Sequence, residues 1–201
     1  MNKKRTEIAE LGEFGLIDRL TANFKQHHTT TVKGVGDDAA VLSIAADEEL
    51  VLTTDSFFEG VDFDLTYFPL KHLGYKCVTA VTGEIYAGFA QPRTLEIRLG
   101  ISAKLDFKHI REVWEGMVAA AKEHGYKSVG LDLLPSPNGL TISTSAVGET
   151  TLLMHKRKPA AKSMDLICVS DNLGAAFMGF QVLERERKAF EKSGDVKAQP
   201  K

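Results

Sequence analysis

A change in the spacing of apolar residues between positions 69 and 101 constrains the fold of this chain more than any other feature. From Pro69 to Phe89, apolar residues recur every three or four positions, which is typical of one face of a helix. This stripe consists of Leu70, Leu73, Cys77, Val81 and Ile85. From Leu95 to Ile101, apolar residues occupy every second position, which is typical of a half-buried strand. The stretch is therefore predicted to be a helix followed by a strand.

The same reasoning predicts further elements on both sides of this pair. In chain order they are a helix at about residues 12–24, hairpin strands at 40–44 and 50–54, a helix at 106–124, and strands near 128 and at 140–147. The strands run together instead of alternating regularly with helices. This order predicts an α+β domain, in which helices cover one face of a mixed or antiparallel sheet.

Four segments are predicted along the chain. The first domain covers residues 1–148, and residues 149–163 form a charged, proline-marked linker. Residues 164–191 contain a predicted strand at 165–170 and a predicted helix from Leu173 to Phe190. Since one strand and one helix cannot bury a core of their own, this segment is predicted to be the incomplete start of a second, α/β domain. Residues 192–201 are a polar tail.

Composition excludes several classes of function. The 201 residues are 43% hydrophobic and 26% charged, as in a globular protein, and the net charge of −2 gives no bulk attraction to nucleic acid or to anionic membranes. The two cysteines, Cys77 and Cys168, are far apart and predict neither a zinc site nor a disulfide framework. No apolar run has the length of a signal peptide or a membrane span, so a cytoplasmic protein is expected.

Acidic residues at predicted loops and strand ends are the candidates for chemistry. The stretch Gly34–Val41 contains Asp37 and Asp38 beside glycine, which fits either a solvated turn or a site for Mg²⁺. If the strands on either side of residues 45–49 pair, Asp38 and Asp55 come to the same end of the hairpin. Glu84 and Asp132 are the other two candidates. The chain contains no P-loop motif, so carboxylate-held metal ions would have to do much of the work on a phosphate.

The order and spacing of several short motifs over about residues 11–190 resemble the thiamine-monophosphate kinase family, which belongs to the aminoimidazole ribonucleotide synthetase-like superfamily. The motifs include Gly34–Leu42, Thr53-Thr54-Asp55, Glu59-Gly60-Val61, Leu73–Lys76, Ile85-Tyr86-Ala87, Gly130 with Asp132, and Leu173–Ala176. The resemblance implies ATP-dependent phosphorylation of thiamine monophosphate to thiamine diphosphate, by a Mg²⁺-assisted in-line transfer. It also implies a homodimer that forms through the sheet of the N-terminal domain.

The same resemblance implies roles for particular residues, without assigning a catalytic one. The implied Mg²⁺ contacts are Asp38, Thr53, Thr54, Asp55, Glu84 and Asp132. The implied ATP contacts are Asp37, Leu131, Asp132 and Lys158. Asp62 falls in the region that binds the substrate.

The chain departs from the family pattern at the implied site. Val81-Thr82-Gly83-Glu84 stands where the family has Asn-Leu-Ser-Asp, Asp62 stands where it has His, and Leu131 and Leu133 replace a Gly and a Thr. These changes support an alternative, a catalytically degenerate paralogue that keeps the fold and the dimer interface. A third hypothesis is a relative with a different ATP-dependent phosphoryl or amidine-forming reaction. The chain alone is expected to be weakly active or inactive.

Overall fold

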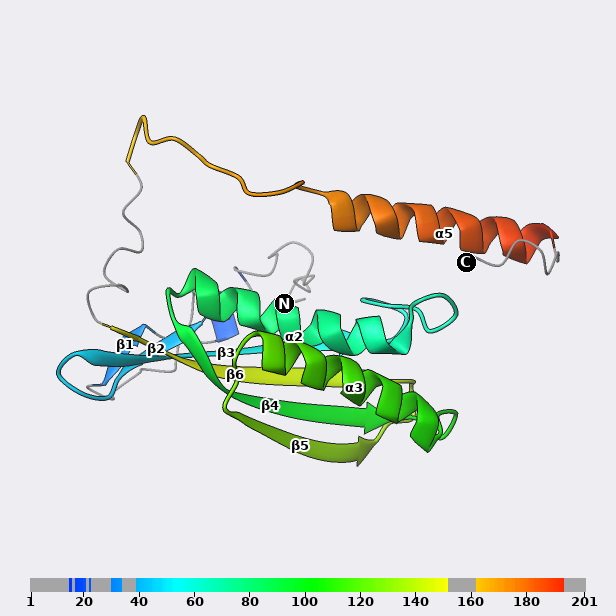
Figure 1. Cartoon of the computed structure of the whole chain (residues 1–201), viewed down its shortest axis with the longest axis horizontal. Helices are drawn as coiled ribbons and strands as arrows, with labels where there is room; N and C mark the ends of the chain where they lie inside the picture. Colours follow the sequence, from blue (N-terminus) through cyan, green and yellow to red (C-terminus); the bar gives the residue numbers. More distant parts are fainter. Residues whose placement is uncertain are drawn as a thin grey trace, which may run out of the picture.

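The computed structural model describes residues 15, 17–20, 22, 30–33, 39–151 and 162–193. Its main body is a six-stranded sheet in the order β1-β2-β3-β6-β4-β5, with helices α2 and α3 side by side on one face (Figure 1). The elements are β1 (Thr31–Lys33), β2 (Ala40–Ser43), β3 (Glu48–Phe58), α2 (Leu70–Ala87), β4 (Gln91–Ile101), α3 (Phe107–Glu123), β5 (Ser128–Pro135), β6 (Thr141–Thr151) and α5 (Ala175–Ser193).

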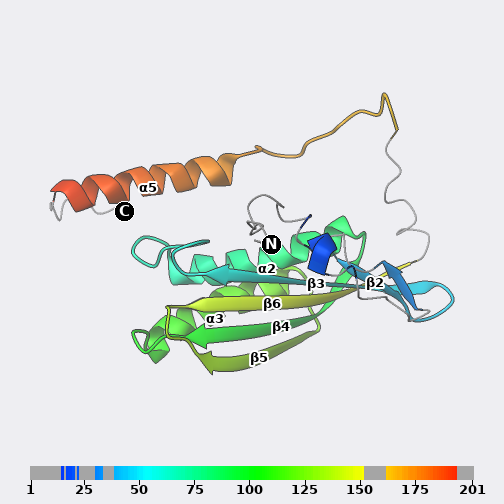
Figure 2. The same ribbon diagram turned by 180° about the vertical axis from the view of Figure 1, so that it is seen from behind.

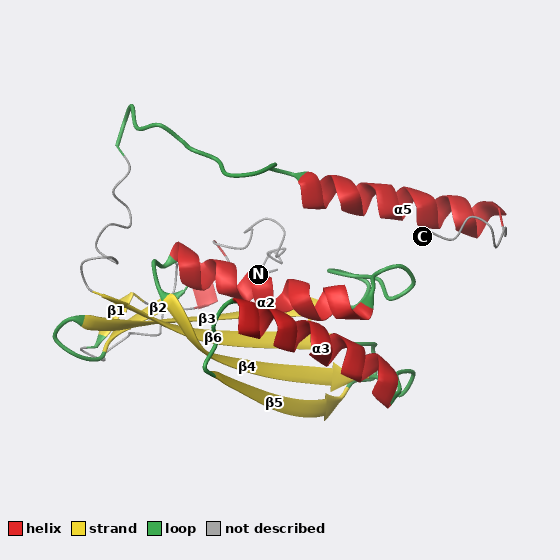
Figure 3. Cartoon of the chain, in the orientation of Figure 1, coloured by secondary structure: helices red, strands yellow, loops and turns green. Residues whose placement is uncertain are grey.

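The sheet is mixed, and its centre is a long antiparallel ladder. β3 and β6 pair over their full lengths, from Glu48 opposite Thr151 to Phe58 opposite Thr141. β4 pairs antiparallel with β6 and parallel with the edge strand β5. Helices lie on one face only, and the view from behind shows the strands in front of α2 and α3 (Figure 2). The prediction of an α+β fold with a mixed sheet and helices on one face is therefore confirmed (Figure 3).

The hydrophobic core lies between the sheet and the two helices. The alternating positions Val51 and Phe57 of β3 and Leu95, Ile97 and Leu99 of β4 point towards the helices and are buried. They meet the predicted stripe of α2, of which Leu73, Cys77, Val81 and Ile85 are fully buried. The change in apolar spacing between residues 69 and 101 thus predicts both layers of the core: the helix α2 and the strand β4 that lies beneath it.

Several elements differ from the sequence-based expectation. β3 was expected to end at residue 54 but continues to Phe58, so Asp55 lies within the strand and not after it. β6 likewise continues to Thr151, three residues into the predicted linker. The predicted strand at 165–170 is wrong, because these residues are extended without a pairing strand among those described. A strand needs a neighbour for its backbone hydrogen bonds, and this segment runs apart from the sheet (Figure 1).

Other expectations fall largely outside the described residues. Of the predicted helix at 12–24, the described residues 15 and 17–20 are helical, and residue 22 lies in a turn. The loop at 34–38 and most of the linker, residues 152–161, lie outside. None of the described helices is both long and apolar enough to cross a membrane.

Two glycines let α2 and α3 approach each other closely. A Cβ on Gly74 of α2 would lie 1.9 Å from the carbonyl oxygen of Val113, and a Cβ on Gly116 of α3 would lie 1.9 Å from that of Lys71. These distances are far below van der Waals contact with backbone atoms, which cannot rotate away. The two helices therefore pack backbone against backbone, and each supplies one of the two glycines.

Gly74→Ala and Gly116→Ala should each destabilise the fold by about 2 kcal/mol or more, because the added methyl group forces the helices apart. Gly83→Ala, on the same helix as Gly74, is the matched control, because a Cβ at Gly83 would have no atom within 4 Å. We expect the control to be neutral or to stabilise by about 0.5–1 kcal/mol, because alanine favours helix. Urea unfolding curves would measure all three, and equal losses at the three sites would contradict this packing.

The carboxyl group of Glu49 is an unusual feature of the core. Glu49 of β3 is fully buried on the helix side of the sheet, and neither carboxylate oxygen has a hydrogen-bond partner in the part of the chain that the structure describes. Its neighbour across the ladder, Thr150, directs its hydroxyl to the carbonyl oxygen of Phe89 instead. A buried polar group without a hydrogen bond costs free energy, so Glu49 is a local weakness of the core.

Replacing Glu49 by methionine, which keeps the length and removes the polar atoms, should raise the free energy of unfolding by about 1–3 kcal/mol. Glu48→Met is the control, because Glu48 is exposed one position earlier, and its effect should stay within about 0.5 kcal/mol. Thermal melts would compare the two variants. A loss of stability in Glu49→Met would show that this carboxyl group makes a stabilising interaction.

Candidate functional site

Two of the predicted site residues, Thr53 and Glu84, meet between β3 and α2, and a third, Asp55, lies on the same face of β3. Because side chains alternate along a strand, Thr53 and Asp55 both point towards the helices, as buried Val51 and Phe57 do. Glu84 lies on α2 above this strand, and the Thr53 hydroxyl donates a hydrogen bond to its carboxylate. The hydroxyl therefore holds Glu84 over the sheet, on the same face as Asp55.

The charges of both Asp55 and Asp62 affect the pKa of the Cys77 thiol. Burial raises the pKa of the Cys77 thiol to about 12; the positive charge of Lys76 lowers this pKa, and the negative charges of Asp55 and Asp62, each with a smaller effect than Lys76, raise it. Both carboxylates therefore lie near the same thiol on α2. Asp62 sits in the turn after β3, where its Oδ2 accepts a hydrogen bond of 2.7 Å from the backbone N–H of Phe58.

Thr54 faces the opposite side of the sheet. Its hydroxyl donates to the carbonyl oxygen of Thr144 at 3.1 Å and lies 2.9 Å from the Ser145 hydroxyl. It follows that Thr53 and Thr54, which the resemblance groups together, cannot contact one ion from the same side of this sheet.

Asp132 also faces that opposite side, and it lies far from Asp55. The register aligns Asp55 with Thr144, Ile97 and Leu131 in one row across the sheet. Three inter-strand spacings, about 14 Å, thus separate Asp55 from Leu131, the neighbour of Asp132. Asp132 itself forms an exposed ion pair with Arg98, with 2.9 Å between Nε and Oδ2. Within one chain, Asp132 does not lie beside Asp55.

The remaining predicted contacts are distributed as follows. Leu131 is on the helix-facing side of β5 but 46% exposed, because α3 does not reach this edge strand. Asp37, Asp38 and Lys158 lie outside the described residues. The roles that the resemblance implies for these four residues remain predictions.

The oxygen atoms at β3 and α2 fit part of a magnesium site. The carboxylates of Asp55 and Glu84 and the hydroxyl of Thr53 are hard oxygen ligands. Among the residues that the structure describes, no three His, Cys, Asp or Glu side chains are grouped closely enough to hold a metal ion. Mg²⁺ commonly binds through one or two carboxylates together with phosphate oxygens and water, so an incomplete protein set of this kind fits a metal that arrives with a nucleotide.

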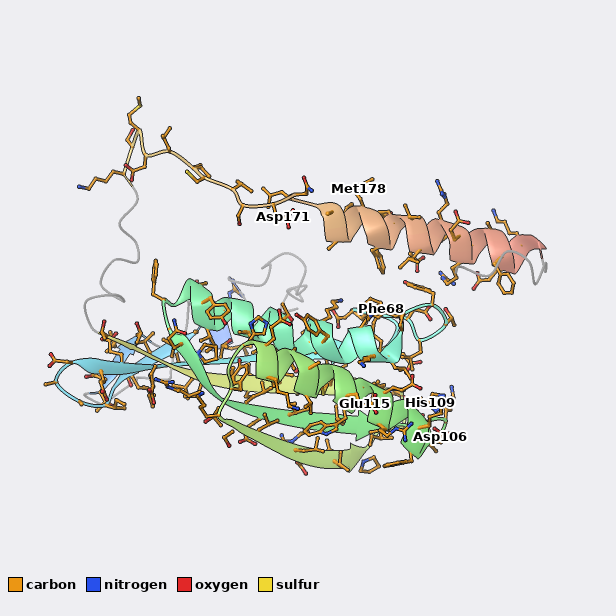
Figure 4. The ribbon with its side chains drawn as sticks, in the orientation of Figure 1. Phe68, Asp106, His109, Glu115, Asp171 and Met178 are labelled. Carbon is orange, nitrogen blue, oxygen red and sulfur yellow. The ribbon has the colours of Figure 1, made fainter. Side chains whose placement is uncertain are left out.

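A cavity that the sequence did not reveal lies on the side of α2 that faces α5. It has a volume of about 720 Å³ and lies between α2, the loop after β3, and α5. Its lining residues are Val61, Asp62, Phe68, His72, Tyr75, Lys76, Ala176, Phe177, Gly179, Phe180 and Leu183. Phe68 stands on the side of the loop that faces α5 (Figure 4). α5 is far in the sequence from the other residues that line the cavity. The sequence therefore indicated only that the apolar stripe of α5, with Phe177 and Phe180, packs against another part of the protein.

Polar contacts attach α5 to the loop before α2. The Tyr67 hydroxyl donates to Glu184 at 2.8 Å, and burial together with this hydrogen bond raises the pKa of Tyr67 to about 12. Arg187 donates to Glu184 at 3.1 Å and lies 4.0 Å from Asp64. The rings of Tyr67 and Phe180 are 6.4 Å apart between centroids. These contacts hold α5 against the loop before α2.

Comparison with known proteins finds relatives of this chain. The family model described as AIR synthase related protein, N-terminal domain, matches residues 36–150. The thiamine-monophosphate kinase of Bacillus subtilis (strain 168) is 26% identical over 176 residues, and that of Aquifex aeolicus (strain VF5) is 29% identical over 184 residues. These alignments cover 88% and 92% of this chain but 54% and 56% of the relatives. The chain thus spans about half the length of the curated relatives that it matches.

Solved structures agree with these matches. A structure described as AaThiL complexed with AMPPCP and TMP is 28% identical, with a TM-score of 0.64 over 74% of this chain and 45% of that chain. The structure of tt0281 from Thermus thermophilus, at 22% identity and a TM-score of 0.61 over 72% of this chain and 46% of that chain, shares the fold.

The two cysteines should differ sharply in reactivity. At about pH 8, only roughly 10⁻⁴ of a thiol with a pKa near 12 is thiolate, the form that reacts with iodoacetamide, and Cys77 is also buried. Cys168 is exposed. We expect Cys168→Ser to abolish labelling of the folded chain and Cys77→Ser to leave it unchanged, as measured by mass spectrometry. Rapid labelling of Cys77 would contradict its described surroundings.

Proposed function

Because the chain belongs to the family of AIR synthase related proteins, N-terminal domain, we propose that it forms the Mg-ATP-binding part of a kinase that converts thiamine monophosphate to thiamine diphosphate. The observation that carries the proposal is the hydrogen bond by which Thr53 holds Glu84 over the face of β3 on which Asp55 also lies. The names of the relatives support thiamine monophosphate as the acceptor.

Each of these three side chains has a distinct part in the proposed site. Asp55 offers a carboxylate on the rigid central strand, which fixes its position. Thr53 orients Glu84 by hydrogen bonding one of its oxygens. Mg²⁺, when bound, would offset the charge of the polyphosphate and help to align the transferred phosphoryl group. Asp38 would add a second short carboxylate, as the resemblance implies.

The residues on the other face need a second chain in this proposal. Thr54 and Asp132 are directed away from Asp55, on the sheet face that no described helix covers. A homodimer that forms through this face, as the resemblance implies, would give them a second set of neighbours. We therefore propose that the contacts of Thr54 and Asp132 belong to the homodimer and not to the single chain.

An ATP analogue with Mg²⁺ should stabilise the folded chain, because a ligand that binds only the native state raises its stability by mass action. At a concentration of about 100 times Kd the gain is about 2.7 kcal/mol, or a rise in melting temperature of about 5 °C or more. Asp55→Asn should abolish the rise, and Asp47→Asn, in the exposed turn between β2 and β3, should preserve it. A full rise in Asp55→Asn would contradict the assignment.

Kinase activity separates the proposal from the degenerate paralogue. We expect the chain alone to phosphorylate thiamine monophosphate slowly, since it matches only about half the length of the relatives that carry this name. Turnover at roughly 1 per second or more, an ordinary kinase rate, would contradict that expectation. If neither a melting shift nor any turnover appears, the degenerate paralogue is the better description.

A further inference from the structure

A second cavity lies between the loop before α2, the helix α3 and the C-terminal half of α5. Its volume of about 540 Å³ is within the usual range for small-molecule sites. Its apolar walls are formed mainly by Leu65, Tyr67, Phe68 and Phe190. None of its lining residues is among those assigned to Mg²⁺ or ATP, so the proposed function leaves this cavity without a role.

The carboxylate of Glu112 is the unusual group in this cavity. Glu112 is half-buried on α3 and lines the cavity, and no residue in the described part of the chain forms an ion pair or a hydrogen bond with its carboxylate. The other two charged groups of the lining are Arg187 and Glu191, and they pair with each other at 2.6 Å between Nη1 and Oε1. A carboxylate that is partly removed from water and has no partner favours a cation beside it.

The remaining charges around the cavity do not supply that cation. The guanidinium of Arg187 is shared, because it also lies 3.1 Å from Glu184 and 4.0 Å from Asp64. One guanidinium therefore serves three carboxylates, the third being Glu191. The ammonium of Lys188 is 3.9 Å from Glu184, on the exposed side of α5. The charges that line the cavity itself are two negative and one positive.

The N-terminal end of α2 acts in the opposite direction. Pro69 and Leu70 line the cavity, and the first turn of α2 has no side-chain cap. The free N–H groups of a helix end are equivalent to about half of a positive charge and favour an anion. This is smaller than the full negative charge of Glu112, so the balance of charge in the cavity favours a cation.

We propose that this cavity binds a small organic ammonium compound, with its apolar body between Phe68 and Phe190 and its ammonium group donating to the Glu112 carboxylate. A hydrogen bond between two charged groups is among the stronger kinds, and nearby aromatic rings add attraction for a cation. The apolar walls suit an organic cation better than a metal ion, and among the described residues no three His, Cys, Asp or Glu side chains are grouped closely enough to hold one. The site goes beyond the proposed function.

Titration of the whole chain with three probes of similar shape, followed by NMR, tests the charge preference. The probes are phenethylamine, the neutral phenethyl alcohol and the anion hydrocinnamate. We expect phenethylamine to bind about tenfold or more tightly than hydrocinnamate, with the alcohol between them. Absence of phenethylamine binding, or equal affinities for the three probes, would overturn the proposal.

A pair of variants on α3 tests the role of Glu112. Glu112→Gln keeps the size of the side chain and removes its charge, so it should weaken phenethylamine binding about fivefold or more and leave phenethyl alcohol unchanged. Glu115→Gln is the matched control, because Glu115 lies on the same helix, does not line the cavity and pairs with Arg111 (Figure 4). It should change neither affinity. An unchanged affinity for phenethylamine in Glu112→Gln would contradict the proposal.

Methyl signals in the same NMR titration test the location. Leu65 and Leu70 line this cavity, and Leu183 lines the larger one. The methyl signals of Leu65 and Leu70 should shift with phenethylamine while those of Leu183 stay in place, and the reverse pattern would place the ligand elsewhere. The titration contains neither nucleotide nor Mg²⁺, so its failure and that of the Mg-ATP melting shift are distinguishable.

Discussion

The close contact of α2 with α3 at Gly74 and Gly116 is the constraint on which the site depends. It leaves no room for side chains between the two backbones, so α2 has one lateral position over the sheet. That position places Glu84 above Thr53 and Cys77 near Asp55. A packing requirement in the helix layer thus fixes where Glu84 lies over Thr53 of the sheet.

The alternation of side chains along each strand then decides which face of the sheet a polar residue lies on. Adjacent residues of a strand point to opposite faces, so Thr53 and Asp55 join the helix side while Thr54 joins the open side. The same alternation along β5 puts Leu131 and Asp132 on different sides. A motif that is compact in sequence, such as Thr53-Thr54-Asp55, therefore serves two surfaces in space, and only one of them can contribute to a given ligand.

Much of the fold could be predicted because its determinants are local. The stripe of α2 and the alternation in β4 need no knowledge of distant residues, and both proved correct. β3 was harder to delimit, because Thr54, Asp55 and Ser56 are typical of a strand end. Their pairing with β6 is supplied by a segment about 90 residues away, and the ladder satisfies the backbone whatever the side chains are.

The site was predictable only in part for the same reason. Sequence patterns identified Asp55 and Glu84 as candidates and the family resemblance added Thr53, but the position of Asp132 depends on the strand order, in which β6 and β4 separate β5 from β3. The cavity depends on α5, whose apolar stripe shows that it packs on something without showing on what. The contact of α5 with the loop before α2 is a tertiary contact between residues far apart in the sequence. Nothing in the sequence around Tyr67 or Glu184 indicates that the two form a hydrogen bond.

The acidic residues around Cys77 show why this end of the domain is suited to binding and not to packing. Asp55 and Asp62 lie near a thiol that is itself buried, and Lys76 is the one cation whose charge acts on the same thiol among the influences that shift its pKa. A divalent cation at Asp55, as the proposed function places it, would add positive charge at this margin of the low-dielectric core, where charges interact more strongly than in water.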